Sequence, residues 1–228
     1  MFTYGFMSPV ETKRRRTSVL EDSVMSDLVH PLTERLKRVC AHANAEFDRG
    51  VGVHGERIKC APGCSSCCSQ IFQITEVEAA RISAWVKTLP SSEREALQTK
   101  ARLNLVERAK LFDAPEQWGD SVPRGHGTPC AALNEDGACG MYEARPIMCR
   151  KFGVPIFNPD QPDRVMACEL NFADGEAIED PGLIENQTNL YRAQQALQAA
   201  YNDAGGKRDD KPICIARAIV EDFTDYLP

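Results

Sequence analysis

The sequence predicts a mainly α-helical protein with one small β-hairpin and an irregular, loop-rich centre framed by the helices. Three observations carry this prediction. Apolar residues recur every three or four positions in several long segments, which indicates amphipathic helices. Asp136-Gly137 separates two short apolar runs, which is typical of a hairpin turn. Four cysteines fall at positions 60, 64, 67 and 68, in a segment whose glycine, proline and serine residues favour a loop.

The N-terminal part combines an irregular tail with a long helix. Residues 1–19 have no apolar periodicity and contain the basic run 13–16, so we expect a flexible tail. A helical stripe then runs from Leu28 to Phe47, and Cys40 belongs to it, so we expect Cys40 in the core. The glycines between 50 and 55 are expected to break this helix. We expect a single domain over 20–228, with its cysteine-rich core at about 58–170.

Two helices and a long loop follow the first cysteine cluster. Thr75 to Glu78 has the capping-box pattern and opens a helix that Pro90 closes. Residues 92–95 repeat the pattern before a second stripe that reaches Phe112, and we expect the two helices to form an antiparallel pair. Residues 113–130 are rich in glycine and proline, which is typical of a long loop that serves a site.

The second half begins with the predicted hairpin at 130–142, whose strands would bring Cys130 and Cys139 together. Pro146 suits the first turn of a short helix that carries Cys149. Residues 154–182 are expected to be irregular. Helical spacing returns at 190–201 and again at 216–227, which predicts two final helices.

Composition excludes several classes of protein. The chain has 228 residues, 27 Lys plus Arg and 33 Asp plus Glu, for a net charge of −6, so it is not expected to bind nucleic acid. No apolar stretch approaches the roughly 18–20 residues of a membrane-spanning helix, so no membrane association is expected. Residues 1–10 are too short and too polar for a secretory signal. We therefore expect a reducing cytoplasm, where clustered cysteines serve as metal ligands more often than as disulfides.

The cysteines are the chain's main chemical signal, because it has ten of them. Soft thiolates at the spacing of Cys60, Cys64, Cys67 and Cys68 are the ligands that zinc or an iron–sulfur cluster selects. Four more, Cys130, Cys139, Cys149 and Cys168, lie in the second half. The neighbours Cys67 and Cys68 would point to opposite faces of an extended chain, so they could serve different centres. Two four-cysteine sites, or one cluster plus a spare set, both fit the sequence.

Two other cysteine chemistries fit less well. A radical enzyme that cleaves S-adenosylmethionine needs a run of βα units, and Ser66 stands where those enzymes usually have an aromatic residue. A thioredoxin-like site needs a preceding strand, which Cys64 lacks. His126 is expected to be a loop residue without a ligand role. Arg145 and Arg150 flank Cys149 and could offset the negative charge of thiolate ligands.

The cysteine segments resemble a known family, the YkgJ-like cysteine-cluster proteins, which are described as zinc- or iron-chelating domains. Residues 60–68, Cys-Ala-Pro-Gly-Cys-Ser-Ser-Cys-Cys, match its CxxxCxxCC motif. Cys130 and the run 136–152 match its C…DGxCxxYxxRPxxCRxF block. The resemblance covers about residues 58–170.

The resemblance implies that the loop-rich centre is a metal-binding centre holding an iron–sulfur cluster or zinc. Its implied ligands are Cys60, Cys64, Cys67, Cys68, Cys130, Cys139 and Cys149, with Cys168 as the eighth. Relatives are often labelled iron–sulfur oxidoreductases, so one hypothesis is an iron–sulfur redox protein. The alternative is a non-catalytic, zinc-stabilised binding module that engages a protein or small-molecule partner.

Overall fold

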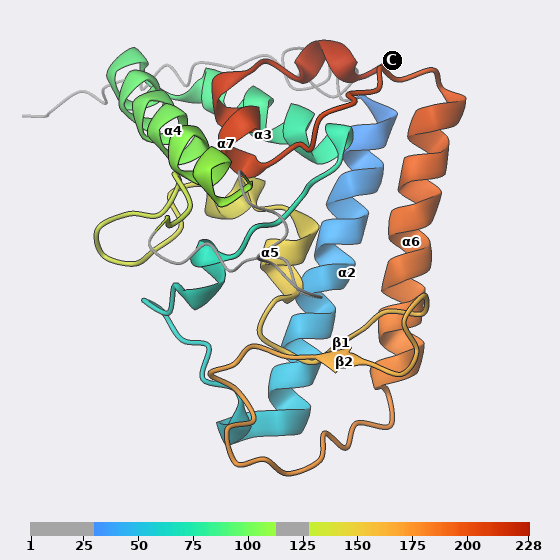
Figure 1. The fold of residues 1–228 in the computed structure, drawn as a ribbon. Helices are drawn as coiled ribbons and strands as arrows, with labels where there is room; N and C mark the ends of the chain where they lie inside the picture. Colours follow the sequence, from blue (N-terminus) through green and yellow to red (C-terminus); the bar gives the residue numbers. More distant parts are fainter. Residues whose placement is uncertain (1–29, 113–127) are drawn as a thin grey trace, which may run out of the picture. The chain divides into compact units, whose positions relative to one another are not determined.

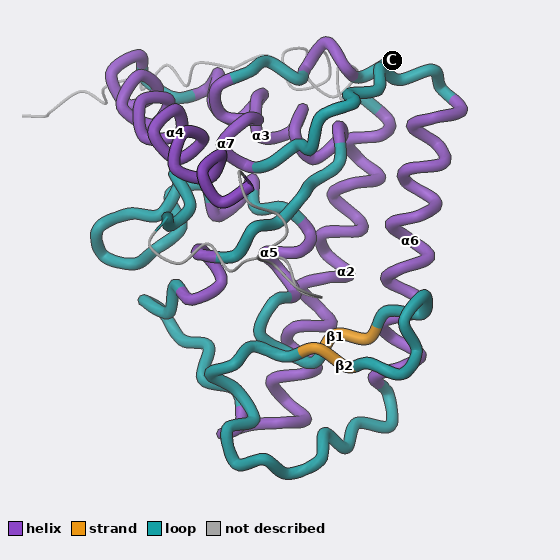
Figure 2. Tube along the Cα trace, in the orientation of Figure 1, coloured by secondary structure: helices purple, strands orange, loops and turns teal. Residues whose placement is uncertain are grey.

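The structure, a computed structural model, describes residues 30–112 and 128–228. The predicted tail at 1–19 and most of the predicted loop at 113–130 lie outside these residues. Figures 1 and 2 show the described part as a set of helices joined by long connections. The helices are α2 (Pro31–His54), α3 (Glu76–Thr88), α4 (Ser91–Phe112), α5 (Ile147–Lys151), α6 (Leu183–Asp203) and α7 (Ile215–Val220). Short 3₁₀ turns lie at Gly55–Arg57, Ser66–Ser69, Tyr142–Ala144 and Thr224–Tyr226.

One small antiparallel sheet accompanies the helices. Strands β1 (Ile156–Phe157) and β2 (Val165–Met166) pair with Ile156 opposite Met166. The predicted fold class, mainly α with a small hairpin, is thus confirmed. The hairpin is not where the sequence pattern put it, because β1 and β2 fall in the stretch 154–182 that was expected to be irregular. At 130–142 the chain instead makes a tight turn, in which Leu133 and Cys139 form an isolated antiparallel bridge.

Helix α2 is longer than predicted. It runs through Gly50 and Gly52 and ends at His54, so the expectation that these glycines break the helix was wrong. A Cβ atom at Gly50 would lie 2.7 Å from Val154 Cγ1. Glycine therefore serves close packing of α2 against the chain after α5, and the helix ends only at Gly55, where φ is +49°.

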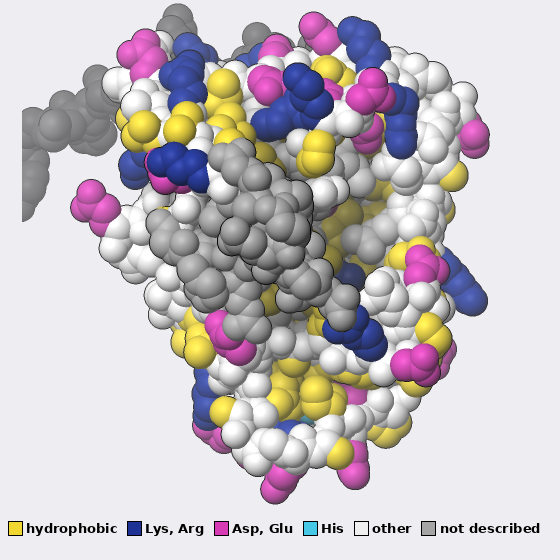
Figure 3. Space-filling view, viewed as in Figure 1, with side chains coloured by type: hydrophobic (Ala, Val, Ile, Leu, Met, Phe, Trp, Pro, Cys, Tyr) yellow, Lys and Arg dark blue, Asp and Glu magenta, His cyan; other side chains and the backbone are white. Residues whose placement is uncertain are grey.

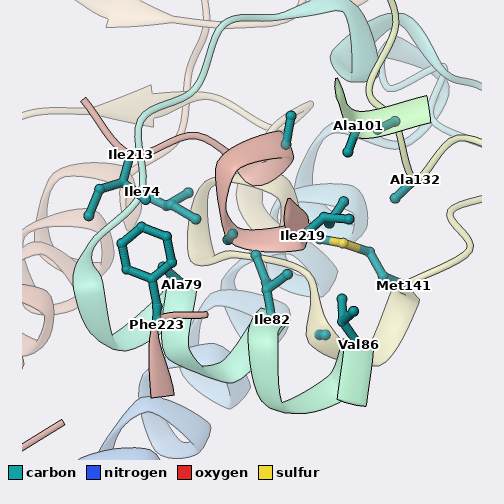
Figure 4. Close-up of a cluster of buried hydrophobic side chains, with 14 of the residues drawn as sticks. Ile74, Ala79, Ile82, Val86, Ala101, Ala132, Met141, Ile213, Ile219 and Phe223 are labelled. Carbon is teal, nitrogen blue, oxygen red and sulfur yellow. The ribbon is translucent and has the colours of Figure 1, made fainter. Parts of the chain in front are cut away.

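The helix α3 begins with the predicted capping box. The Thr75 hydroxyl accepts a hydrogen bond from Glu78 N, and the Glu78 carboxylate accepts one from Thr75 N. The predicted antiparallel pairing of α3 with α4 was wrong, because α7 lies between them and packs on both. Small side chains, Ala216 and Ala218, are fully or almost fully buried on α7 and allow this close approach. Figure 4 shows Ile219 of α7 meeting Ile82 of α3 and Met141 in this first cluster of the core.

A second cluster of the core joins α2 to α6. Leu36 and Leu190 are completely buried in it, and Cys40 is 4% exposed, which confirms that Cys40 is a core residue. Arg49, Glu46 and Asp180 form a cluster of ion pairs at the other end of the same two helices. Arg49 donates to Glu46 at 2.7 Å and to Asp180 at 2.7 Å. Because Asp180 precedes α6, this pairing holds the long segment after the cysteines against α2.

The face of the described part that Figure 3 shows is mixed in charge. In the space-filling view, lysine, arginine and acidic side chains are interspersed among hydrophobic ones across the coloured part of the visible face (Figure 3). Among the described residues, no helix combines the length and the apolar character that a membrane span requires.

Candidate metal centre

The eight cysteines of the predicted ligand set all line one cavity. It has a volume of about 660 Å³ and lies between α2, α4 and the start of α7. Its cysteines are Cys60, Cys64, Cys67, Cys68, Cys130, Cys139, Cys149 and Cys168. They come from four separate segments, so the fold gathers thiols that lie more than 100 positions apart in the sequence.

The first segment is a series of tight turns. Cys64 N donates to Ala61 O at 2.9 Å, and Gly63 has a φ of +89°, which favours glycine. Cys67 and Cys68 lie in the 3₁₀ turn Ser66–Ser69. The two neighbours are therefore not in an extended chain, and both face the cavity. The expectation that they point to opposite faces applied to an extended chain, so it does not hold for this turn.

The second segment lies directly against the first. Cys130 N donates to Cys68 O at 2.7 Å, which places these two cysteines side by side. The turn at 134–138 has Gly137 at a φ of +81°, as Asp-Gly predicted. A Cβ atom at Gly137 would lie 2.9 Å from Gly63 O. Glycine at both positions thus lets the two cysteine-bearing turns approach each other closely.

Helix α5 carries Cys149, and a buried carboxylate positions it. Glu78 is 6% exposed, and its Oε1 accepts a hydrogen bond from Ile147 N at 2.8 Å, at the start of α5. Its Oε2 belongs to the capping box of α3. A single side chain therefore caps two helices, and this double cap sets the position of Cys149 relative to the first core cluster.

Burial and neighbouring thiols set the protonation of the cysteines. Burial raises the pKa of Cys130 to about 11, and it also raises the pKa of Cys149 and Cys139. Cys67 differs, because a hydrogen bond from the Cys68 thiol lowers its pKa to about 7, with help from the charge of Arg145. The same hydrogen bond raises the pKa of Cys68. Cys67 is thus the thiol of this pair that ionises first.

Three arginines line the cavity, and among the described residues none of them pairs with a carboxylate. Arg150 is 7% exposed and donates to the carbonyls of Arg145 and Glu143 and to Asn44. Arg145 stacks on the Tyr142 ring, with Cζ 3.6 Å from its centre. Arg108 is 9% exposed, and its Nε has no hydrogen-bond partner in the described chain. Such cations compensate the negative charge of thiolate ligands.

The donor set fits zinc or iron, although the thiols surround a space and do not yet meet at a point. Among residues 30–112 and 128–228, no three His, Cys, Asp or Glu side chains lie close enough together to hold one ion. Eight soft thiols beside three guanidinium groups nevertheless match the preferences of a thiolate-bound metal. Four-thiolate zinc carries a net charge of about −2, which these arginines can offset. Binding would require the cysteine-bearing turns to close around the ion.

The other predicted residues lie elsewhere. Cys40 is in the core of α2, and Cys214 caps α7; neither lines the cavity. His126 lies outside the described residues. Sequence reasoning missed Asn104 and Arg108 on α4, which share a face with the buried Ala101. Two polar residues four positions apart beside an apolar stripe were the available signal.

The cysteine-rich part of the chain matches a known family. Residues 59–169 match the family model CxxCxxCC, described as "Putative zinc- or iron-chelating domain". No curated protein and no solved structure matches the chain. The matched segment includes all eight cysteines that line the cavity and excludes Cys40 and Cys214.

Proposed function

We propose that the cavity is a chelating site and that its eight cysteines are the ligands, because residues 59–169 match the model of a zinc- or iron-chelating family. The single observation that carries this proposal is which of the ten cysteines line the cavity. Eight from distant segments line one cavity, and the other two do not. A packing role alone would not require eight thiols around an open space.

We favour an iron–sulfur centre with a redox role. Arginines beside thiolates, such as the three that line the cavity, tune the reduction potential of such a cluster, as do hydrogen bonds to its sulfurs. The cavity also falls within the volume range of small-molecule sites, so a substrate could reach the centre. A reducing cytoplasm, where the thiols stay available for metal, is the compartment that suits this role.

The alternative is a zinc site without catalysis. The segments around the cavity are short turns and a five-residue helix, α5, and the cavity takes the place of apolar core between them. In such a region the binding energy of the metal becomes folding energy. The protein would then present its helices or the segment 113–130 to a protein or small-molecule partner.

Anaerobic purification followed by metal analysis tests the proposal. A brown protein with an absorption band at roughly 400 nm would support the iron–sulfur centre. A colourless protein with stoichiometric zinc would support the alternative. Protein that takes up neither metal after reconstitution under reducing conditions would overturn both.

A further inference from the structure

Asn171 lies just beyond the matched family segment and joins three pieces of chain beside the cavity. Its side chain is buried, with 5% exposed. Its Oδ1 accepts a hydrogen bond from Lys59 N at 2.8 Å, and its Nδ2 donates to Gly153 O. The same Nδ2 lies 3.8 Å from Cys60 Sγ. One amide group thus fixes the backbone before Cys60 and faces its sulfur.

The turn that carries Asn171 also holds Cys168. Asn171 N donates to Cys168 O at 2.9 Å. The next residue, Phe172, has a φ of +57°, which is rare outside glycine. Its N–H donates to Arg57 O at 3.2 Å, and the Arg57 guanidinium stacks on its ring at 4.6 Å. A strained backbone persists only where its surroundings determine it, so this turn has a fixed position relative to Cys60.

The remaining cysteines are held by different bonds. Cys68 O accepts from Cys130 N, and Leu133, which donates to Cys130 O at 3.0 Å, forms the bridge to Cys139. Asn104 of α4 donates to Pro129 O at 2.6 Å, directly before Cys130. None of these bonds involves Asn171. The backbone therefore separates a Cys60–Cys168 side of the cavity from a Cys68–Cys130–Cys139 side.

We infer that five of the eight cysteines act as two groups and that Asn171 is the positioning residue of the group that contains Cys60 and Cys168. The second group contains Cys68, Cys130 and Cys139. Cys64, Cys67 and Cys149 are assigned to neither group. The inference rests on the proposed function, because it divides the same site. An amide N–H aimed at a thiolate orients the ligand and disperses its charge.

The test is alkylation of the full chain loaded with Zn²⁺ under reducing, oxygen-free conditions, read by mass spectrometry at each cysteine. Asn171→Asp keeps the acceptor for Lys59 N but removes both donors. We expect Cys60 and Cys168 to react faster, because removal of such a partner typically weakens metal binding by roughly tenfold or more. The second group should keep its wild-type rates. The reciprocal control Asn104→Ala should expose the second group and spare the first.

The outcomes separate this inference from the proposed function. Wild-type protein that binds neither zinc nor iron and gains no protection would overturn the proposed function itself. If the wild type binds zinc and Asn171→Asp raises the alkylation rates of both groups equally, the cysteines form one centre. If Asn171→Asp leaves all alkylation rates unchanged, Asn171 has no positioning role. Either result overturns the inference. Cys40, which is 4% exposed, reports unfolding. If it reacts, the milder Asn171→Ser, which retains a donor, should show the same pattern at smaller amplitude, and equal exposure of both groups there would again overturn the inference.

Discussion

Replacing Gly153 by alanine should damage the fold and the metal centre together. Gly153 has a φ of +122°, and a Cβ atom there would lie 2.5 Å from Cys60 Sγ and 3.4 Å from Phe47 Cε2. Ordinary contacts between such atoms are about 3.5–4.0 Å, so Cys60 must move by about 1 Å. Strain in the backbone and overpacking together should cost about 2–5 kcal/mol.

The assay is urea unfolding of Gly153→Ala, with and without Zn²⁺, combined with metal analysis. We expect a lower free energy of unfolding in both states and a smaller gain on adding zinc, because the displaced Cys60 can no longer bind well. Gly52→Ala is the matched control. Gly52 lies in α2 with nothing within 4 Å of its Cβ position, so alanine there should stabilise by about 0.5–1 kcal/mol. Wild-type stability and metal content in Gly153→Ala would refute the placement of Cys60.

Three further predictions concern charge and coupling. Arg145→Gln removes a compensating charge but no ligand, so metal should be retained and released faster to a chelator; complete loss of metal in a folded variant would contradict this. Arg217 lowers the pKa of Asp209 to about 2, below about 3.9 in an unfolded chain, so this pair stabilises the fold above about pH 4 and stops doing so as the pH falls through 2. The stability deficit of Asp209→Asn in urea should therefore shrink between about pH 4 and 2, and a constant deficit would count against the pair. Amide exchange after chelation under reducing conditions should show protection lost together around Cys67 and Cys139, because Cys68 and Cys130 are hydrogen-bonded; opening of one segment alone would show that they are uncoupled.

Sequence patterns predicted correctly those features that depend on interactions between residues close together in the chain. The capping box at Thr75 and the turn glycine Gly137 form as the sequence indicated. Gly50 was wrongly predicted to break α2, because this glycine allows close contact with Val154, a residue about 100 positions away. Strands β1 and β2 have two residues each, too few to show a period. Such features depend on tertiary packing, which a single sequence does not display.

The helix at the C-terminus shows the same limit. Apolar spacing continues to Leu227, yet α7 ends at Val220. The Ser83 hydroxyl donates to Ala218 O at 2.9 Å and accepts from Phe223 N at 3.1 Å. These bonds replace the continuation of the helix. For the site, cysteine spacing and family resemblance predicted the eight candidates, whereas Asn104, Arg108 and Asn171 could be found only from their positions in the fold.

The most direct test of the central claim is the metal content of ten single Cys→Ala variants, each purified anaerobically and measured as equivalents per chain. The account predicts a loss of metal for each of the eight cysteines that line the cavity. It predicts wild-type content for Cys40→Ala and Cys214→Ala, whose sulfurs lie in the core and at the start of α7. Loss of a metal equivalent in either of these two, or full retention after removal of any of the eight, would contradict it.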